Sequence, residues 1–143
     1  MRFNSIKAGF ELKNPAFFRS WLKKVIAEES EEKTGEIQYI FCDDKYLHAI
    51  NTSFLNHDTY TDIITFPSVP DSRQIISGEI YISIDRVKEN SHSLGHSFNE
   101  ELSRVLVHGL LHLLGYDDGS PKEIELMRQK EDYYLNLQAQ KNS

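Results

Sequence analysis

Two histidines four residues apart, followed closely by a pair of acids, are the residues of this sequence best suited to chemistry. His108 and His112 lie in the stretch VLVHGLLHLLGYDD, which ends in Asp117 and Asp118. Residues four apart on a helix project from the same face, so both imidazoles would face one point. Neutral imidazole is a common metal ligand, and a carboxylate oxygen can join it. We therefore predict a metal centre with His108, His112 and Asp118 as ligands.

The surroundings of the two histidines support this prediction. Apart from the two histidines and Gly109, every residue from 105 to 114 is valine or leucine, which indicates a buried helix. Each imidazole left there without a partner would cost about 1–3 kcal/mol, and one metal ion would satisfy both. Gly115 lets the chain reverse after the helix and return a carboxylate to the histidines. A hydrogen-bonded pair of core histidines is the alternative that this spacing leaves open.

Two histidines and one carboxylate leave the fourth position of a tetrahedral ion to water, as in catalytic zinc sites. Asp117 competes with Asp118 as third ligand; otherwise it would cap the turn, accept the second ring N–H of a ligating histidine, or move protons. The metalloprotease motif has Glu after its first histidine, where this chain has Gly109. Peptide hydrolysis by that mechanism is therefore disfavoured. Gly109 instead predicts close packing of another element, or of substrate, against the helix.

Composition places the chain among globular domains of ordinary size. It has 143 residues, of which 39% are hydrophobic and 27% charged, and no apolar run approaches the roughly 20 residues of a membrane span. The first residues, MRFNSIKAGFELKN, lack the apolar segment of a secretory signal. Cys42 is the only cysteine, which favours a buried small hydrophobe in a reducing compartment, the cytoplasm. The net charge of −6 argues against a broad basic surface for nucleic acid.

Hydrophobic periodicity predicts strands and helices in alternation around this helix. Asn14, Asp43 or Asp44, Asp85 and Ser97 are the expected helix caps. The strands are expected at residues 2–12, 36–42, 62–66 and 78–83, and the helices at about 15–28, 44–54, 85–94, 97–114 and from 120 onward. We predict one α+β domain over residues 1–143, with a four-stranded mixed sheet covered by helices and a buried metal-binding helix.

The stretch HGLLHLLGYDD, residues 108–118, closely resembles the HGxLHLxGYDH signature of the YbeY family of bacterial endoribonucleases. Upstream, Leu55-Asn56 and TDIITFP at 61–67 are similar to the LN…TDVLSFP segment of that family, and GEIYIS at 78–83 is similar to its GDIxIS strand. Residues 120–132 look like its acidic C-terminal helix. The resemblance covers roughly residues 36–135.

The resemblance implies an α+β domain with one Zn²⁺ at the two histidines. It implies a metal-dependent, single-strand-specific endoribonuclease that matures the 3′ end of 16S ribosomal RNA and takes part in ribosome quality control. It also implies cytoplasmic association with ribosomes or their assembly factors, and neither a membrane nor DNA as partner.

The first departure from the family pattern is at the third ligand. The family signature ends in His, and this chain has Asp118 there. A carboxylate can bind zinc, but it makes the site one unit more negative, so that Mn²⁺ or Fe²⁺ are alternatives.

The second departure is in the loop after Asn56, which is shorter and lacks the arginine expected to face phosphate. His57, Arg73 and Arg104 are the nearest substitutes. Arg104 lies one turn before His108 on the same helical stripe, although an arginine on a helix surface is the ordinary interpretation.

The expected mechanism is metal-assisted phosphoryl chemistry, with the ion lowering the pKa of a water or polarising a phosphoryl oxygen. His57, Arg104 and Asp117 complete the candidate catalytic set, and either water or the RNA 2′-hydroxyl could attack. Two alternatives stay open. One is a non-catalytic, metal-stabilised ribosome-assembly factor, which the absent loop arginine favours. The other is a metal-dependent hydrolase of a small substrate or peptide, whose peptide version Gly109 opposes.

Overall fold

A computed structural model describes residues 1–31, 33–55, 61–68 and 75–141 of the chain. These residues form one α+β domain, which confirms the predicted fold class. The strands are β1 (Arg2–Ser5), β2 (Lys33–Cys42), β3 (Ile63–Pro67) and β4 (Ile75–Ser83). The helices are α1 (Pro15–Glu29), α2 (Asp44–Leu55), α3 (Ile84–Leu94), α4 (Phe98–Leu113) and α5 (Pro121–Lys141). Within the described part of the chain, none of these helices has the length and apolar character needed to cross a bilayer.

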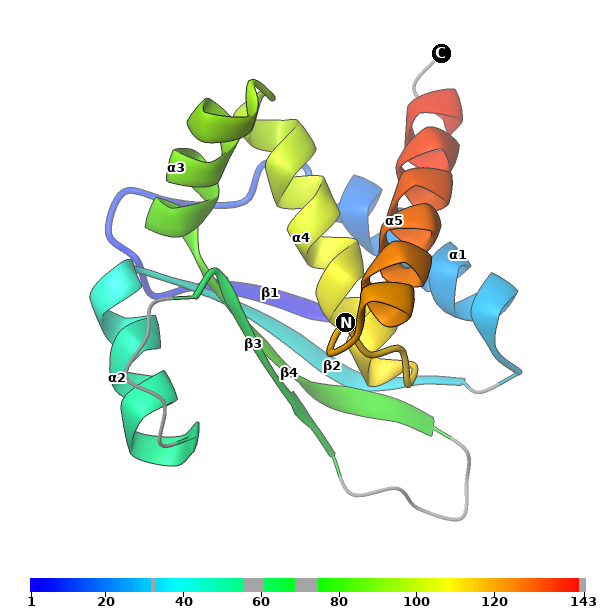
Figure 1. Ribbon diagram of the computed structural model, residues 1–143, viewed down its shortest axis with the longest axis horizontal. Coiled ribbons are helices and arrows are strands. Elements are labelled where there is room, and N and C mark those ends of the chain that lie inside the picture. Colours follow the sequence, from blue (N-terminus) through cyan, green and yellow to red (C-terminus); the bar gives the residue numbers. More distant parts are fainter. Residues whose placement is uncertain (32, 56–60, 69–74, 142–143) are drawn as a thin grey trace.

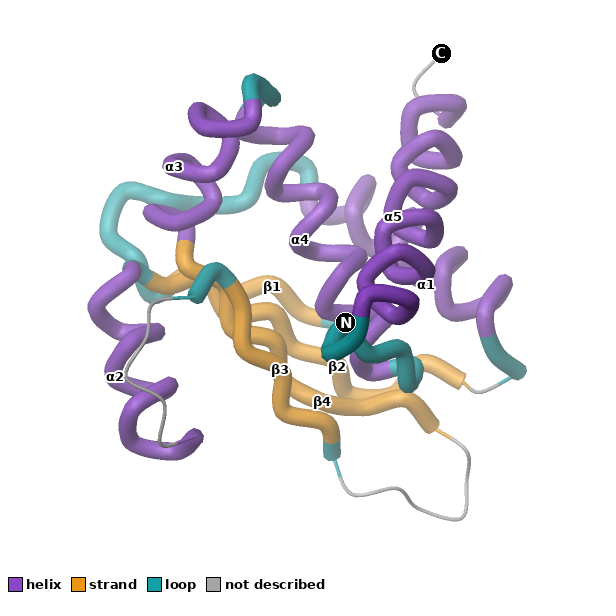
Figure 2. The backbone as a smooth tube through the Cα atoms, viewed as in Figure 1, coloured by secondary structure: helices purple, strands orange, loops and turns teal. Residues whose placement is uncertain are grey.

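The four strands form a single mixed sheet in the order β1-β2-β4-β3. β1, β2 and β4 run parallel to one another, and β3 is antiparallel to β4 at the edge. Helices α1, α3, α4 and α5 lie on one face of the sheet, and α2 lies on the other (Figure 1; Figure 2). Side chains alternate between the two faces of a strand. Ile80 and Ile82 of β4 accordingly enter the large core under α4, while Tyr81 packs on the α2 side.

Helix α4 passes through the middle of the large core. Eight of its side chains are buried, as predicted for a buried helix; they are Glu101, Leu102, Ser103, Val105, Leu106, Val107, Leu110 and Leu111. The Tyr39 hydroxyl of β2 donates a hydrogen bond of 2.8 Å to the Leu106 carbonyl. The Trp21 indole of α1 donates one of 2.8 Å to the Tyr134 carbonyl of α5. These two bonds fix α4 and α5 relative to the sheet and to α1.

At Gly109, helix α4 packs closely against the sheet. A Cβ atom at this position would lie 2.8 Å from Ile63 Cδ1 and 2.9 Å from Ile80 Cγ2. Of the two partners proposed for Gly109, it is therefore the sheet that packs against it. The missing side chain allows α4 to rest on β3 and β4, and this contact sets the height of the two histidines above the sheet.

The N-terminal strand is shorter than the alternation of residues 2–12 predicted. β1 ends at Ser5, and the chain turns at Gly9, whose φ is +80°. Phe10 then packs edge-on against Phe41 and Phe98. Residues after Ser5 therefore bury their apolar side chains by closing one end of the core, not by extending the sheet.

The predicted helix caps were right in part. Asn14 occupies the N-cap position before Pro15 as predicted, but its backbone is left-handed with φ 56° and its side chain makes no capping bond. Helix α3 is capped by Ser83, whose hydroxyl accepts from the Arg86 N–H, and not by Asp85. The Asp85 carboxylate instead accepts a hydrogen bond of 3.0 Å from the Asp44 N–H, which joins the starts of α2 and α3. Of the two candidate caps of α2, Asp43 and Asp44, it is Asp43 whose carboxylate accepts a hydrogen bond of 2.7 Å from the Tyr46 N–H.

Candidate metal centre

Helix α4 and the turn that follows it bring the three predicted ligands together. The hydroxyl of Ser97 accepts from the Glu100 N–H and starts the helix in the predicted capping geometry. The helix ends before Gly115, whose φ of +104° reverses the chain, and the Tyr116 N–H bonds back to the Leu111 carbonyl at 3.0 Å. This reversal returns Asp118 to the histidine face of α4.

The three donor atoms lie at the distances that a tetrahedral ion requires. The two Nε2 atoms of His108 and His112 are 3.1 Å apart, and Asp118 Oδ2 lies 3.4 Å from each of them. Ligands bound about 2.0–2.1 Å from a tetrahedral zinc ion lie about 3.3 Å from one another. The residues present therefore fit a divalent metal ion held by these three atoms.

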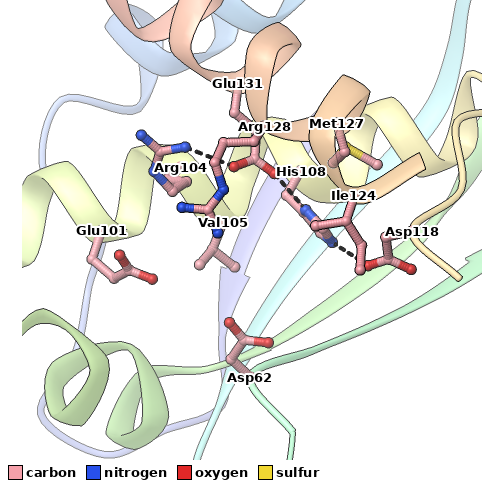
Figure 3. A pocket seen from close by; sticks show the side chains of 10 residues that line it. All are labelled: Asp62, Glu101, Arg104, Val105, His108, Asp118, Ile124, Met127, Arg128 and Glu131. Carbon is pink, nitrogen blue, oxygen red and sulfur yellow. Dashed lines mark hydrogen bonds and ion pairs between the residues drawn. The ribbon is translucent and has the colours of Figure 1, made fainter. Parts of the chain in front are cut away.

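Glu131 of α5 holds the other side of the His108 ring. Its Oε2 lies 2.6 Å from His108 Nδ1, and its side chain is only 8% exposed. A proton on Nδ1 that is donated to this carboxylate leaves the Nε2 lone pair free to bind a cation. Arg104 donates to the second oxygen of Glu131 at 2.8 Å, so that Arg104, Glu131, His108 and Asp118 form one connected series (Figure 3).

These neighbours also change the protonation of His108. Burial lowers the pKa of its imidazole, but the hydrogen bond and charge of Glu131, together with the charge of Asp118, outweigh burial and raise the pKa above its ordinary value. A metal ion at this site would therefore displace a proton that the surrounding carboxylates favour. Metal binding and proton release are coupled for this reason.

Two of the three candidate ligands, His108 and Asp118, line an open cavity of about 320 Å³ between α4 and α5 (Figure 3). Its lining comes from two helical stripes and the residue before β3: Glu101, Arg104, Val105 and His108 of α4; Ile124, Met127, Arg128 and Glu131 of α5; and Asp62, together with Asp118. The cavity has room for a polar ligand next to the metal centre.

Two further acids, which are not candidate metal ligands, line this cavity. Burial raises the pKa of Asp62, against the opposing charge of His108. Burial and the negative charge of Asp62 raise the pKa of Glu101 as well. Glu101 is only 5% exposed, and its Oε1 atom has no hydrogen-bond partner in the part of the chain that the structure describes. A carboxyl group with a raised pKa holds its proton more readily than a free one, which is what a general acid must do.

A second polar cluster fixes the turn that carries Asp118. Glu29 of α1, whose side chain is 7% exposed, accepts hydrogen bonds from the hydroxyls of Tyr116 and Tyr134. Lys130 completes the cluster at 3.2 Å from the same carboxylate. Tyr116 lies two residues before Asp118, so this cluster ties the ligand-bearing turn to α1 and α5.

The structure brings together some of the remaining candidate residues and not others. Arg104 lines the cavity, but its guanidinium is paired with Glu131 at 2.8 Å and with Asp132 at 2.7 Å. Asp117 is exposed and is not among the residues that line the cavity. The place beside the second ring nitrogen of His108, which was one of the roles considered for Asp117, is taken by Glu131. His57 and Arg73 lie outside the described residues.

Sequence reasoning missed Asp62, Glu101, Arg128 and Glu131 as residues of the site. One signal was available on α5, where Ile124, Arg128 and Glu131 follow helical spacing and so share a face. That spacing shows that they lie together, but not that the face meets α4.

Comparison with known proteins gives consistent matches over nearly the whole chain. The sequence model of the family described as Endoribonuclease YbeY matches residues 4–138. Endoribonuclease YbeY of Flavobacterium johnsoniae is 53% identical over 123 residues, which cover 86% of this chain and 86% of that protein. Its counterpart in Christiangramia forsetii is 50% identical, covering 90% of this chain and 87% of that protein. The solution structure of TM1509 from Thermotoga maritima aligns with a TM-score of 0.63 at 27% identity, covering 94% of this chain and 87% of that one.

Proposed function

Because the chain belongs to the YbeY family of endoribonucleases, we propose that it is a metal-dependent endoribonuclease that cleaves single-stranded RNA in the cavity beside His108. The observation that carries this proposal is the convergence of His108, His112 and Asp118 at 3.1–3.4 Å from one another. Three protein ligands leave one position of a tetrahedral ion unfilled, which is the arrangement of catalytic and not structural sites.

The proposed cofactor is one Zn²⁺ per chain, with Mn²⁺ or Fe²⁺ as alternatives because Asp118 contributes a carboxylate oxygen. When bound, such an ion would supply Lewis-acid stabilisation of the charge that develops on a phosphoryl group. Glu131 holds the His108 ring in the tautomer that can bind a cation, and Arg104 holds Glu131. Asp62 and Glu101, whose pKa values are raised, face the same cavity and are proposed to carry the protons.

The proposed physiological substrate is the 3′ precursor end of 16S ribosomal RNA, with a role in ribosome quality control. The proposed partners are ribosomes or ribosome-assembly factors in the cytoplasm, and neither DNA nor a membrane. The names of the relatives support an RNA substrate. A chain of net charge −6 has no excess of basic residues for broad nucleic-acid binding, so we place RNA recognition in this cavity.

The experiment that tests this function is cleavage of a single-stranded RNA that contains a 16S 3′ precursor end, with the same sequence in duplex form for comparison. Wild type loaded with metal would be compared with His112→Ala and with His92→Ala, which removes an exposed histidine of α3 that is not part of the cavity lining. Metal content would be measured on each protein. The three proteins would be purified identically, so that a contaminating nuclease appears in all of them.

We expect wild type and His92→Ala to cleave the single strand, and chelator or His112→Ala to abolish both cleavage and metal retention. Equal cleavage by His112→Ala would mean that the nuclease is a contaminant. Metal binding without cleavage in wild type would favour the non-catalytic assembly factor. Cleavage of neither RNA, combined with hydrolysis of small phosphoesters, would favour a small-substrate hydrolase.

A further inference from the structure

We propose that Arg128 is the phosphate-binding residue of the cavity, and that it binds a backbone phosphate of the RNA beside the metal centre. This inference rests on the proposed function and names the residue that positions its substrate. Arg128 is one of two arginines that line the cavity among the described residues, the other being Arg104.

The position of Arg128 follows from the periodicity of α5. Residues three and four apart lie on one helical face, so Ile124, Arg128 and Glu131 share the face that turns toward α4. Glu131 is bonded to His108 Nδ1, and Arg128 lies one turn before Glu131. Figure 3 shows the Arg128 side chain extending from α5 into the cavity, with His108 and Asp118 on one side and Asp62 below it.

The two cavity arginines differ in whether their charge is already paired. Arg104 donates to Glu131 at 2.8 Å and to Asp132 at 2.7 Å, so its positive charge is already paired with two carboxylates. No hydrogen bond or ion pair joins the Arg128 side chain to any other described residue, and Arg128 is exposed to solvent. A free guanidinium offers a planar fork of N–H donors that matches two oxygens of a phosphate.

The charges around the cavity give this free cation a specific role. Four acidic side chains, those of Asp62, Glu101, Asp118 and Glu131, line the cavity that a phosphodiester would enter. Arg104 compensates Glu131, and the proposed metal ion would compensate Asp118. Arg128 then supplies positive charge that no carboxylate of the described chain takes up. Because the chain has no excess of basic residues elsewhere, loss of this one contact is expected to be visible in RNA affinity.

The test is the affinity of single-stranded RNA for Arg128→Ala, Arg128→Lys and the matched control Arg2→Ala, measured by fluorescence anisotropy at several salt concentrations with metal bound. Arg2 is an exposed arginine on β1, at the opposite edge of the sheet from β3, and does not line the cavity. Cleavage kinetics and metal content would be recorded on the same proteins.

We expect Arg128→Ala to weaken RNA binding about tenfold or more and to flatten the slope of log K against log salt by about 0.7, the contribution of one phosphate contact in single strands. Its KM should rise with little change in kcat and none in metal content. Arg128→Lys should recover part of the affinity, because lysine keeps the charge without the fork. Arg2→Ala should stay within about twofold of wild type.

An affinity and salt slope of Arg128→Ala equal to those of Arg2→Ala, in a preparation whose wild type cleaves RNA, would overturn the Arg128 proposal and leave the nuclease assignment intact. Loss of affinity in Arg128→Ala, in a preparation whose wild type binds RNA but does not cleave it, would overturn the nuclease assignment and retain the phosphate contact. A wild type that neither binds nor cleaves single-stranded RNA would overturn both.

Discussion

The imidazole of His108 meets a different carboxylate on each of its two nitrogens. Glu131 lies 2.6 Å from Nδ1 with a side chain 8% exposed, and Asp118 lies 3.4 Å from Nε2 with a side chain 46% exposed. Glu131 is also ion-paired with Arg104, whereas Asp118 lies on a turn at the surface. Glu131 is therefore placed to orient the ring, and Asp118 is placed to bind an exchangeable ion.

Glu131→Gln is expected to reduce metal affinity. The amide keeps the size of the side chain but removes the charge that makes the His108 Nε2 a stronger ligand, and changes of this kind typically cost about 10–100-fold in metal affinity. Competition with a chromophoric chelator would measure the change. Glu125→Gln is the matched control, since Glu125 is exposed on the same helix and does not line the cavity. Equal affinities in the two variants would contradict an orienting role for Glu131.

Asp118→His is expected to shift metal preference toward zinc and away from manganese, by roughly tenfold in the ratio of their dissociation constants, or about 1.4 kcal/mol. Imidazole nitrogen suits Zn²⁺, whereas carboxylate oxygen suits Mn²⁺. Both metals would be titrated on the same protein by isothermal calorimetry. The neighbouring Asp117→His serves as control, because Asp117 is exposed and not part of the ligand cluster. An unchanged ratio in Asp118→His would mean that Asp118 does not bind the ion.

At the scale of elements, the geometry of the candidate metal centre depends on how closely α4 lies on the sheet. Gly109 lies between His108 and His112 in sequence, and the atoms of Ile63 and Ile80 occupy the space that a side chain there would need. Any movement of α4 away from β3 and β4 would carry both histidines with it. The glycine that disfavours the metalloprotease mechanism is therefore also the residue that lets the histidine-bearing helix pack on the sheet.

Gly109→Ala is expected to destabilise the fold by about 1–3 kcal/mol, the usual cost of overfilling a core. This cost opposes the gain of up to about 1 kcal/mol that alanine brings to a helix interior. The added Cβ would lie 2.8 Å from Ile63 Cδ1 and 2.9 Å from Ile80 Cγ2, and Ile80 is fully buried. Urea unfolding would measure the change in the free energy of unfolding.

Ile63→Val supplies the control for this prediction, because it removes the Cδ1 atom that the new methyl group would meet. Combined with Gly109→Ala, it should cost less than the sum of the two single changes. Simple additivity, or a Gly109→Ala variant as stable as wild type, would show that α4 can move off the sheet without cost.

At the scale of the whole molecule, buried polar contacts tie the outer elements to the core. Glu29, near the end of α1, accepts hydrogen bonds from Tyr116 in the turn after α4 and from Tyr134 in α5. Trp21 of α1 donates to the backbone of the same tyrosine, Tyr134. Helix α1 is thus joined both to the turn that carries Asp118 and to the helix that carries Glu131 and Arg128.

Glu29→Gln is expected to lower the free energy of unfolding by about 1–3 kcal/mol at neutral pH, because it weakens buried hydrogen bonds to a charged acceptor. Burial alone would raise the pKa of Glu29, but the bonds from Tyr116, Tyr134 and Lys130 outweigh it and lower the pKa below its ordinary 4.5. A carboxylate with a lowered folded-state pKa stabilises the fold fully above its unfolded pKa and loses that contribution as pH falls through the folded value.

The difference in stability between wild type and Glu29→Gln should therefore be constant from neutral pH to about 5 and shrink below about 4.5. Urea unfolding at a series of pH values would follow it. Glu28→Gln, at an exposed neighbour, should show little difference from wild type at any of these pH values. A gap for Glu29→Gln that does not change with acidification would mean that Glu29 is not ionised in the fold.

Local patterns were enough to predict most elements and the candidate ligands. The four-residue spacing of His108 and His112, the stop at Gly115 and the acid after it describe geometry within one helix and one turn, which depends on backbone dihedrals alone. Hydrophobic periodicity likewise placed the strands and helices, and the mixed four-stranded sheet followed from their order. The end of β1 escaped prediction because the alternating pattern continues past Ser5 while the backbone turns away at Gly9.

Only the tertiary structure decided what surrounds those ligands. Glu131 is 23 residues from His108 in sequence, and its role depends on the side of α5 that packs against α4. The same packing pairs Arg104 with Glu131 and Asp132 and leaves Arg128 free in the cavity. Spacing within a helix shows which residues share a face, but the angle and rotation at which two helices pack are set by the whole core. The sequence therefore determined where a metal could bind, and the fold decided which charges stand around it.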